Sequence, residues 1–121
     1  MAKTVLIANV SNSLRTVVKT ALTGVGYNVL EAEGGQAALA LMDGRPIDML
    51  VSDLNMPVMN GIELVKAAKL LPAYKVMPIM LLTTDRQEFQ KEEGTVAGIR
   101  AWMVKPFSPS QLVKTVDKLC S

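Results

Sequence analysis

The chain has 121 residues, of which 50% are hydrophobic and 20% charged, a balance typical of one globular domain with a sizeable core. Its net charge of +2 and its scattered basic residues argue against binding to nucleic acid or to a membrane surface. Histidine is absent, which excludes His-activated nucleophiles, and Cys120 is the only cysteine, which excludes an internal disulfide. Because the start shows no secretory pattern and no apolar segment could span a bilayer, we expect a cytoplasmic protein.

Strand and helix patterns alternate along the first half of the chain. An apolar run predicts a strand over residues 4–8, and apolar residues at helical spacing predict a helix over 14–25. A second strand is predicted over 27–32, and an Ala- and Leu-rich helix over 34–44. The apolar third strand, 48–53, ends on a carboxylate.

The same alternation continues in the second half. A helix is predicted over 62–71, a strand over 78–84, a charged helix over 86–97, a strand over 100–104 and a last helix whose apolar stripe occupies 112–120. Short helices between nearly continuous apolar strands predict a parallel sheet that is covered by helices on both faces. In such sheets ligands bind beyond the carboxyl ends of the strands.

Three side chains at predicted strand ends have chemistry suited to a phosphoryl group. Asp53 ends the third strand, Thr83 lies at the end of the fourth and Lys105 follows the fifth. Taken singly, they are equally typical of a turn residue, a strand former and a solvated charge. Together, a carboxylate, a hydroxyl and an ammonium in one crevice supply the positioning and the charge neutralisation that phosphoryl transfer needs.

The motif D-L-N-M-P-V-M-N-G over residues 53–61, with P-I-M-L-L-T-T over 78–84 and K-P-F over 105–107, resembles the receiver domain of two-component response regulators. The resemblance covers residues 3–120. It is nearest to single-domain chemotaxis regulators of the CheY type, because nothing remains after the last predicted helix for an output domain. It implies an α/β fold of the flavodoxin-like kind, a (βα)5 doubly wound five-stranded parallel sheet of order 2-1-3-4-5, and one receiver domain over 1–121.

The resemblance also implies a role for each matching residue. Asp53 would accept a phosphoryl group from a histidine kinase, and Thr83 and Lys105 would each bind one of its oxygens. The backbone carbonyl of Asn55 would be a ligand of Mg²⁺. Trp102 corresponds to an aromatic residue that turns inward when the threonine moves, although plain packing in the core or in an interface explains it equally well.

A partner surface is implied as well. The predicted helix over 86–97 has few apolar anchors, so we expect it to be among the least stable elements and suited to a two-state rearrangement. In the family, the face formed by the fourth helix, the fifth strand and the fifth helix binds a downstream protein. The family also leads us to expect a cis peptide bond between Lys105 and Pro106.

The sequence departs from the family at the end of the first strand. Receivers carry two adjacent acidic residues there, whereas this chain has Asn9 and Val10, and its first acidic residue is Glu31. The remaining magnesium ligands would be Asp53, the Asn55 carbonyl and, through a water molecule, Asn9. Mg²⁺ is usually held by one or two carboxylates, and the loss of the acidic pair leaves Asp53 as the one carboxylate among these ligands. We therefore expect weak Mg²⁺ binding and slow or kinase-dependent phosphorylation.

Two functions therefore stay open. The first is a stand-alone response regulator that is phosphorylated on Asp53 and is not an enzyme beyond self-catalysed phosphoryl transfer and autodephosphorylation. The second is a pseudo-receiver, a protein-binding module that signals without phosphorylation, which Val10 favours. A hydrolase or a flavin-binding protein of the same fold is a minor third alternative.

Overall fold

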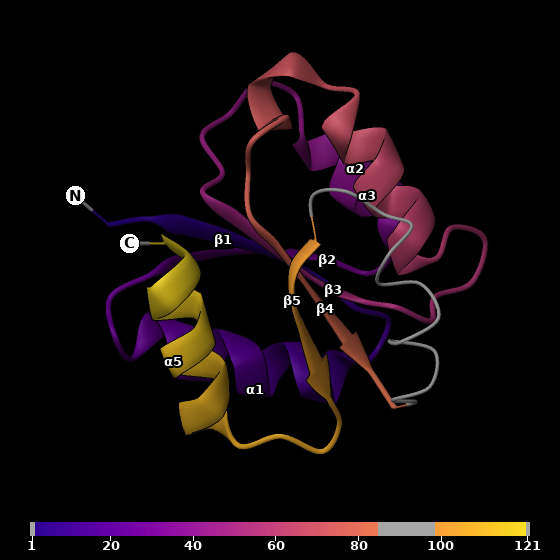
Figure 1. The fold of residues 1–121 in the computed structure, drawn as a ribbon. Coiled ribbons are helices and arrows are strands. Elements are labelled where there is room, and N and C mark those ends of the chain that lie inside the picture. Colours follow the sequence, from indigo (N-terminus) through magenta and orange to yellow (C-terminus); the bar gives the residue numbers. More distant parts are fainter. Residues whose placement is uncertain (1, 85–98, 121) are drawn as a thin grey trace.

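The structure is a computed structural model that describes residues 2–84 and 99–120 (Figure 1). Its strands form one parallel five-stranded sheet in the order β2-β1-β3-β4-β5. The strands are β1 (Thr4–Ala8), β2 (Asn28–Ala32), β3 (Met49–Asp53), β4 (Ile79–Thr83) and β5 (Ile99–Val104). The helices are α1 (Asn12–Thr23), α2 (Gly35–Leu41), α3 (Gly61–Lys69), the short 3₁₀ helix η1 (Pro72–Tyr74) and α5 (Pro109–Cys120). The predicted sheet and its strand order are confirmed.

The sheet separates two apolar layers. Helices α1 and α5 cover one face and α2 and α3 cover the other (Figure 1). Alternate strand residues enter the two layers: Leu6 and Leu50 pack with the α2 and α3 side chains, whereas Ile7 and Val51 pack with those of α1 and α5. Because β3 and β4 are buried on both faces, they are the continuous apolar runs that the sequence shows.

The register of the strands brings their carboxyl ends to one edge. Ala8 is paired with Ser52, and Thr83 is paired with Val104. The peptide bond between Lys105 and Pro106, just beyond this edge, is cis, as expected. Among the helices in the described part of the chain, none combines the length and the apolar character needed to cross a membrane.

Element boundaries differ from the predictions by a few residues at most places. Helix α2 ends at Leu41, because the chain turns away at Met42, so the prediction to residue 44 was too long. In α1 the buried residues are Arg15, Val18 and Leu22, while Val17 and Val25 of the predicted stripe are exposed. The predicted helix over 86–97 lies outside the described residues.

Candidate phosphoryl-acceptor site

Asp53 and Lys105 meet at the carboxyl edge of the sheet. Asp53 is the last residue of β3 and is only 6% exposed, because the strand is buried along its whole length. Lys105 follows β5, and its Nζ forms an ion pair with Oδ1 of Asp53. The structure therefore brings together the predicted acceptor carboxylate and the predicted cation, which lie 52 positions apart in the sequence.

Thr83 lies between these two strands. It ends β4, it is buried, and its carbonyl accepts a hydrogen bond of 2.7 Å from the backbone N–H of Lys105. Trp102 is partly buried on β5, beside Leu81 in the register, and packs against the apolar layer of α2 and α3. Thr83 therefore lies at the edge where the site is. Trp102 lies two positions before the end of β5, and much of its side-chain surface is covered by the apolar layer of α2 and α3.

The loop after Asp53 is held close to the acceptor strand. The N–H of Leu54 donates to the carbonyl of Leu82, and the N–H of Gly61 donates to the carbonyl of Leu54 at 2.7 Å. Asn55 is exposed. An open hollow of about 420 Å³ borders this loop and is lined by Asn55, Met56, Pro57 and Asn60. The predicted ligand Asn55 therefore lies two positions after Asp53, at an exposed position beside this hollow.

The end of β1 has an unusual polar arrangement. Asn9 is 1% exposed, and its N–H donates to the carbonyl of Ala32. Its Oδ1 accepts a hydrogen bond of 2.7 Å from the N–H of Ser11, which makes a local turn before α1. Its Nδ2 is buried and has no hydrogen-bond partner among the described residues. Val10, in contrast, is 47% exposed and offers only an apolar side chain.

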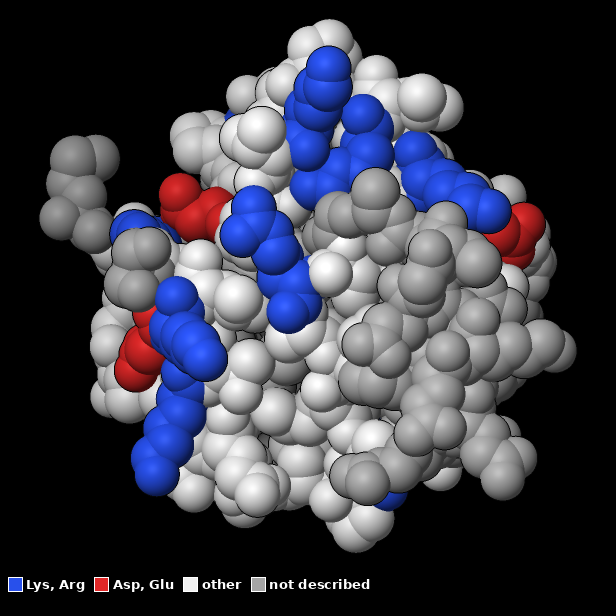
Figure 2. All heavy atoms as spheres, viewed as in Figure 1, with Lys and Arg blue, Asp and Glu red and all other residues white. Residues whose placement is uncertain are grey.

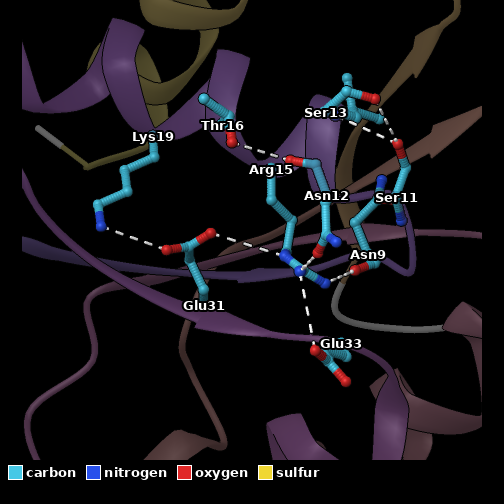
Figure 3. A network of polar contacts seen from close by, with 10 residues as sticks. Asn9, Ser11, Asn12, Ser13, Arg15, Thr16, Lys19, Glu31 and Glu33 are labelled. Carbon is cyan, nitrogen blue, oxygen red and sulfur yellow. Dashed lines mark hydrogen bonds and ion pairs between the residues drawn. The ribbon is translucent and has the colours of Figure 1, made fainter.

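Arg15 ties this end of β1 to its neighbours, as Figure 3 shows. Its guanidinium is buried, and Nη1 donates to the carbonyl of Asn9 at 2.7 Å. Glu31 of β2 approaches Nε at 3.6 Å and also pairs with Lys19. Sequence reasoning did not select Arg15. The available signal was its spacing, since residues 15, 18 and 22 share one helix face.

The described residues at this edge provide few carboxylates for a magnesium ion. Within residues 2–84 and 99–120, no three acidic, histidine or cysteine side chains lie close enough to hold a metal ion. The Oδ1 of Asn9 accepts one hydrogen bond from the N–H of Ser11, and the side chain of Val10 contains no oxygen. Among the described residues, the candidate ligands at this edge are the Asp53 carboxylate and the predicted ligand, the backbone carbonyl of Asn55; Mg²⁺ is usually held by one or two carboxylates.

A doubly wound parallel sheet with a buried carboxylate, a hydroxyl residue and an ammonium at its carboxyl edge defines an α/β domain of the flavodoxin-like class. The chain belongs to the response regulator receiver domain family, whose family model matches residues 5–117. The resemblance noted from the sequence is therefore confirmed, and the chain is a receiver domain of two-component signalling.

Individual proteins are similar over nearly the whole chain. A chemotaxis protein CheY homolog from Campylobacter jejuni (strain 81-176) is 36% identical over 114 residues, 93% of this chain and 88% of that protein. The chemotaxis protein CheY of Pseudomonas aeruginosa is 32% identical over 116 residues, 95% of this chain and 94% of that protein. A high-resolution structure of the chemotaxis response regulator CheY4 of Vibrio cholerae superposes with a TM-score of 0.91 at 40% identity, covering 98% of this chain and 99% of that chain.

Proposed function

We propose that this chain is a chemotaxis-type response regulator whose Asp53 accepts a phosphoryl group from the phosphohistidine of a histidine kinase. The observation that carries the proposal is the ion pair between Lys105 and the buried carboxylate of Asp53. Membership of the receiver family supports the kinase as donor, and the similarity to CheY proteins supports chemotaxis.

The site residues suit an in-line transfer. An Asp53 carboxylate oxygen attacks phosphorus, an O–P bond forms, the N–P bond of the donor breaks, and its electron pair returns to the imidazole nitrogen. Lys105 offsets the negative charge on the phosphoryl oxygens, and Thr83, at the end of β4, binds one of them in this proposal. In this proposal the protein is a phosphoacceptor with self-catalysed transfer and hydrolysis, and it is not an enzyme acting on a separate substrate.

We assign the output to the face that contains β5 and α5. Figure 2 shows Lys and Arg side chains spread over this side of the molecule, with few acidic ones among them. In the described part of that face, Arg100, Lys114 and Lys118 are exposed. A downstream protein with an acidic docking surface would be attracted to it. We also propose that residues 86–97 contribute to this docking face. A cytoplasmic location of the protein is part of the same proposal.

A test of the phosphoacceptor role is incubation with acetyl phosphate or a histidine kinase, followed by intact mass measurement. We expect one added phosphoryl group on the wild-type chain and on Asp43→Asn, which removes an exposed carboxylate. We expect none on Asp53→Asn. An adduct that survives in Asp53→Asn would refute the assignment of the acceptor.

The second candidate is the pseudo-receiver, and the observation in its favour is the end of β1. Asn9 and Val10 stand where the family has acidic residues, so the site is poor in metal-binding oxygens. A wild-type chain that stays folded but forms no adduct with any donor, with or without Mg²⁺, would refute the first function and favour this second one. We propose weak Mg²⁺ dependence for the first function on the same grounds.

A further inference from the structure

The amide of Asn9 is a buried hydrogen-bond donor with nothing to donate to among the described residues. Its orientation follows from its neighbour, because the N–H of Ser11 needs the Oδ1 oxygen as an acceptor at 2.7 Å. Nδ2 must then lie on the opposite side of the amide, and it is buried with no partner in the part of the chain that the structure describes. Leaving a buried donor unpaired costs free energy, and such exceptions in a folded protein call for an explanation such as a bound group.

The strand register places Asn9 next to the acceptor. Ala8 is paired with Ser52, so Asn9 and Asp53 are the next neighbours across β1 and β3. Ile7 and Val51, two positions earlier, both enter the layer of α1 and α5, so strand alternation directs Asn9 and Asp53 to the same side. Adjacent strands lie about 4.8 Å apart, which is within reach of a group attached to the Asp53 carboxylate.

We propose that Nδ2 of Asn9 donates a hydrogen bond to an oxygen of the phosphoryl group on Asp53, and that this donor together with Lys105 allows transfer without a divalent cation. The inference rests on the proposed phosphoacceptor function. A carboxylate at this position would repel the phosphoryl oxygens unless a metal ion lay between them, whereas an amide N–H contacts them directly. Asn9 thus provides a hydrogen-bond donor at the position where the family has a carboxylate that acts through a metal ion.

Arg15 supports this role of Asn9 as a positioning residue. Its Nη1 holds the Asn9 carbonyl at 2.7 Å, and its buried guanidinium brings a positive charge to the end of β1. Glu31 offsets part of that charge at 3.6 Å from Nε. The backbone of Asn9 is therefore fixed from α1 and from β2 at once, which keeps its amide in place before a phosphoryl group arrives.

The test compares the rate of adduct formation from acetyl phosphate in EDTA and in Mg²⁺ for the full chain, measured by intact mass. For wild type we expect the two rates to agree within about threefold. Asn9→Asp has nearly the same shape but lacks the donor. We expect its rate in EDTA to fall about tenfold or more, because one hydrogen bond to a charged oxygen is lost. Its ratio of Mg²⁺ rate to EDTA rate should rise by a similar factor.

Asn28→Asp is the matched control. It adds the same charge at an exposed position at the amino end of β2, away from the carboxyl edge of the sheet. It should behave as wild type. A variant that merely loses stability would lose both rates together and leave their ratio unchanged, which would overturn the inference. A wild-type chain that forms the adduct only with Mg²⁺ would overturn the inference and leave the phosphoacceptor intact. No adduct under either condition would overturn both.

Discussion

The backbone of Val58 adopts a conformation that valine rarely takes. Its φ is 69°, in the left-handed region, and it is the only non-glycine residue with positive φ in the part of the chain that the structure describes. A β-branched side chain is strained there because Cβ approaches the following carbonyl oxygen. Val58 lies in the loop between Asp53 and α3 and is 84% exposed, so its side chain gains little by packing. The strain is local to the loop that shapes the acceptor.

Replacing Val58 with glycine should raise the free energy of unfolding by about 1 kcal/mol, because glycine adopts positive φ without this strain. The measurement is the midpoint of urea unfolding. Val76→Gly is the control, since Val76 is 82% exposed and lacks positive φ. Glycine there should be neutral or destabilising. A lower midpoint for Val58→Gly would contradict the prediction.

Helix α3 starts against the acceptor strand itself. Asn60 and Glu63 form a reciprocal cap at its first turn, with hydrogen bonds of 2.9 and 3.0 Å between each side chain and the other residue's N–H. Gly61, the first helical residue, lies so close to β3 that an added Cβ would be 2.4 Å from the carbonyl oxygen of Asp53. This helix and the acceptor position are therefore coupled by backbone contact.

Gly61→Ala should destabilise the protein by roughly 1–3 kcal/mol and slow adduct formation, because Asp53 or the helix must shift. Gly35→Ala at the start of α2 is the control. The three atoms nearest to its Cβ belong to the side chain of Met59 and not to the backbone, so the loss of stability should be smaller than for Gly61→Ala. Thermal or urea unfolding of both variants measures the difference, and equal effects would refute the coupling.

Helix α5 is joined to the turn before β2 by a side-chain pair. The hydroxyl of Tyr27 donates to the carboxylate of Asp117, and burial, helped by this bond, raises the pKa of the Tyr27 phenol well above its ordinary value near 10. A raised pKa in the folded state contributes stability that is complete below pH about 10 and is lost as the pH rises further.

The free energy of unfolding should therefore fall more steeply above pH about 10 for the wild type than for Tyr27→Phe, which lacks the titrating group. Urea unfolding at a series of pH values measures both slopes. The difference between the two proteins removes the contribution of other groups that titrate in the same range. Parallel slopes would show that the pair between Tyr27 and α5 does not stabilise the fold.

Metal binding to the folded protein can be measured as a change in the free energy of unfolding of the whole molecule. A ligand that binds only the folded state adds RT ln(1 + [L]/Kd), which is less than about 0.4 kcal/mol when the concentration is below Kd. Because Asn9 and Val10 provide no carboxylate to the site, removing 10 mM Mg²⁺ with EDTA should leave the unfolding midpoint nearly unchanged.

Val10→Asp should make that midpoint sensitive to Mg²⁺, with a gain of about 1.4 kcal/mol once the ion is tenfold above Kd. Val17→Asp is the matched control, because Val17 on α1 is 45% exposed and Val10 is 47% exposed. A stabilisation by Mg²⁺ that is as large in wild type as in Val10→Asp would contradict the weak-metal prediction.

Much of the fold could be predicted from local patterns. Apolar runs and helical spacing are properties of neighbouring residues, so the five strands and the fold class were predicted, with errors of a few residues at element ends. The meeting of Asp53 and Lys105 was expected from the rule that parallel strands end at one edge, together with the family motif. The roles of these residues, and of Thr83, Trp102 and Asn55, stay predictions.

By itself the sequence determined the order of the elements, the side chains at the strand ends and the loss of the acidic pair at Asn9 and Val10. Only the tertiary structure decided that Arg15 is buried, that the Asn9 amide has a donor without a partner among residues 2–84 and 99–120, and that Val58 is strained. The physical reason is that these three features depend on contacts between distant segments, such as β2 against α1, and on loop closure. The periodicity of apolar residues along the chain cannot predict such contacts.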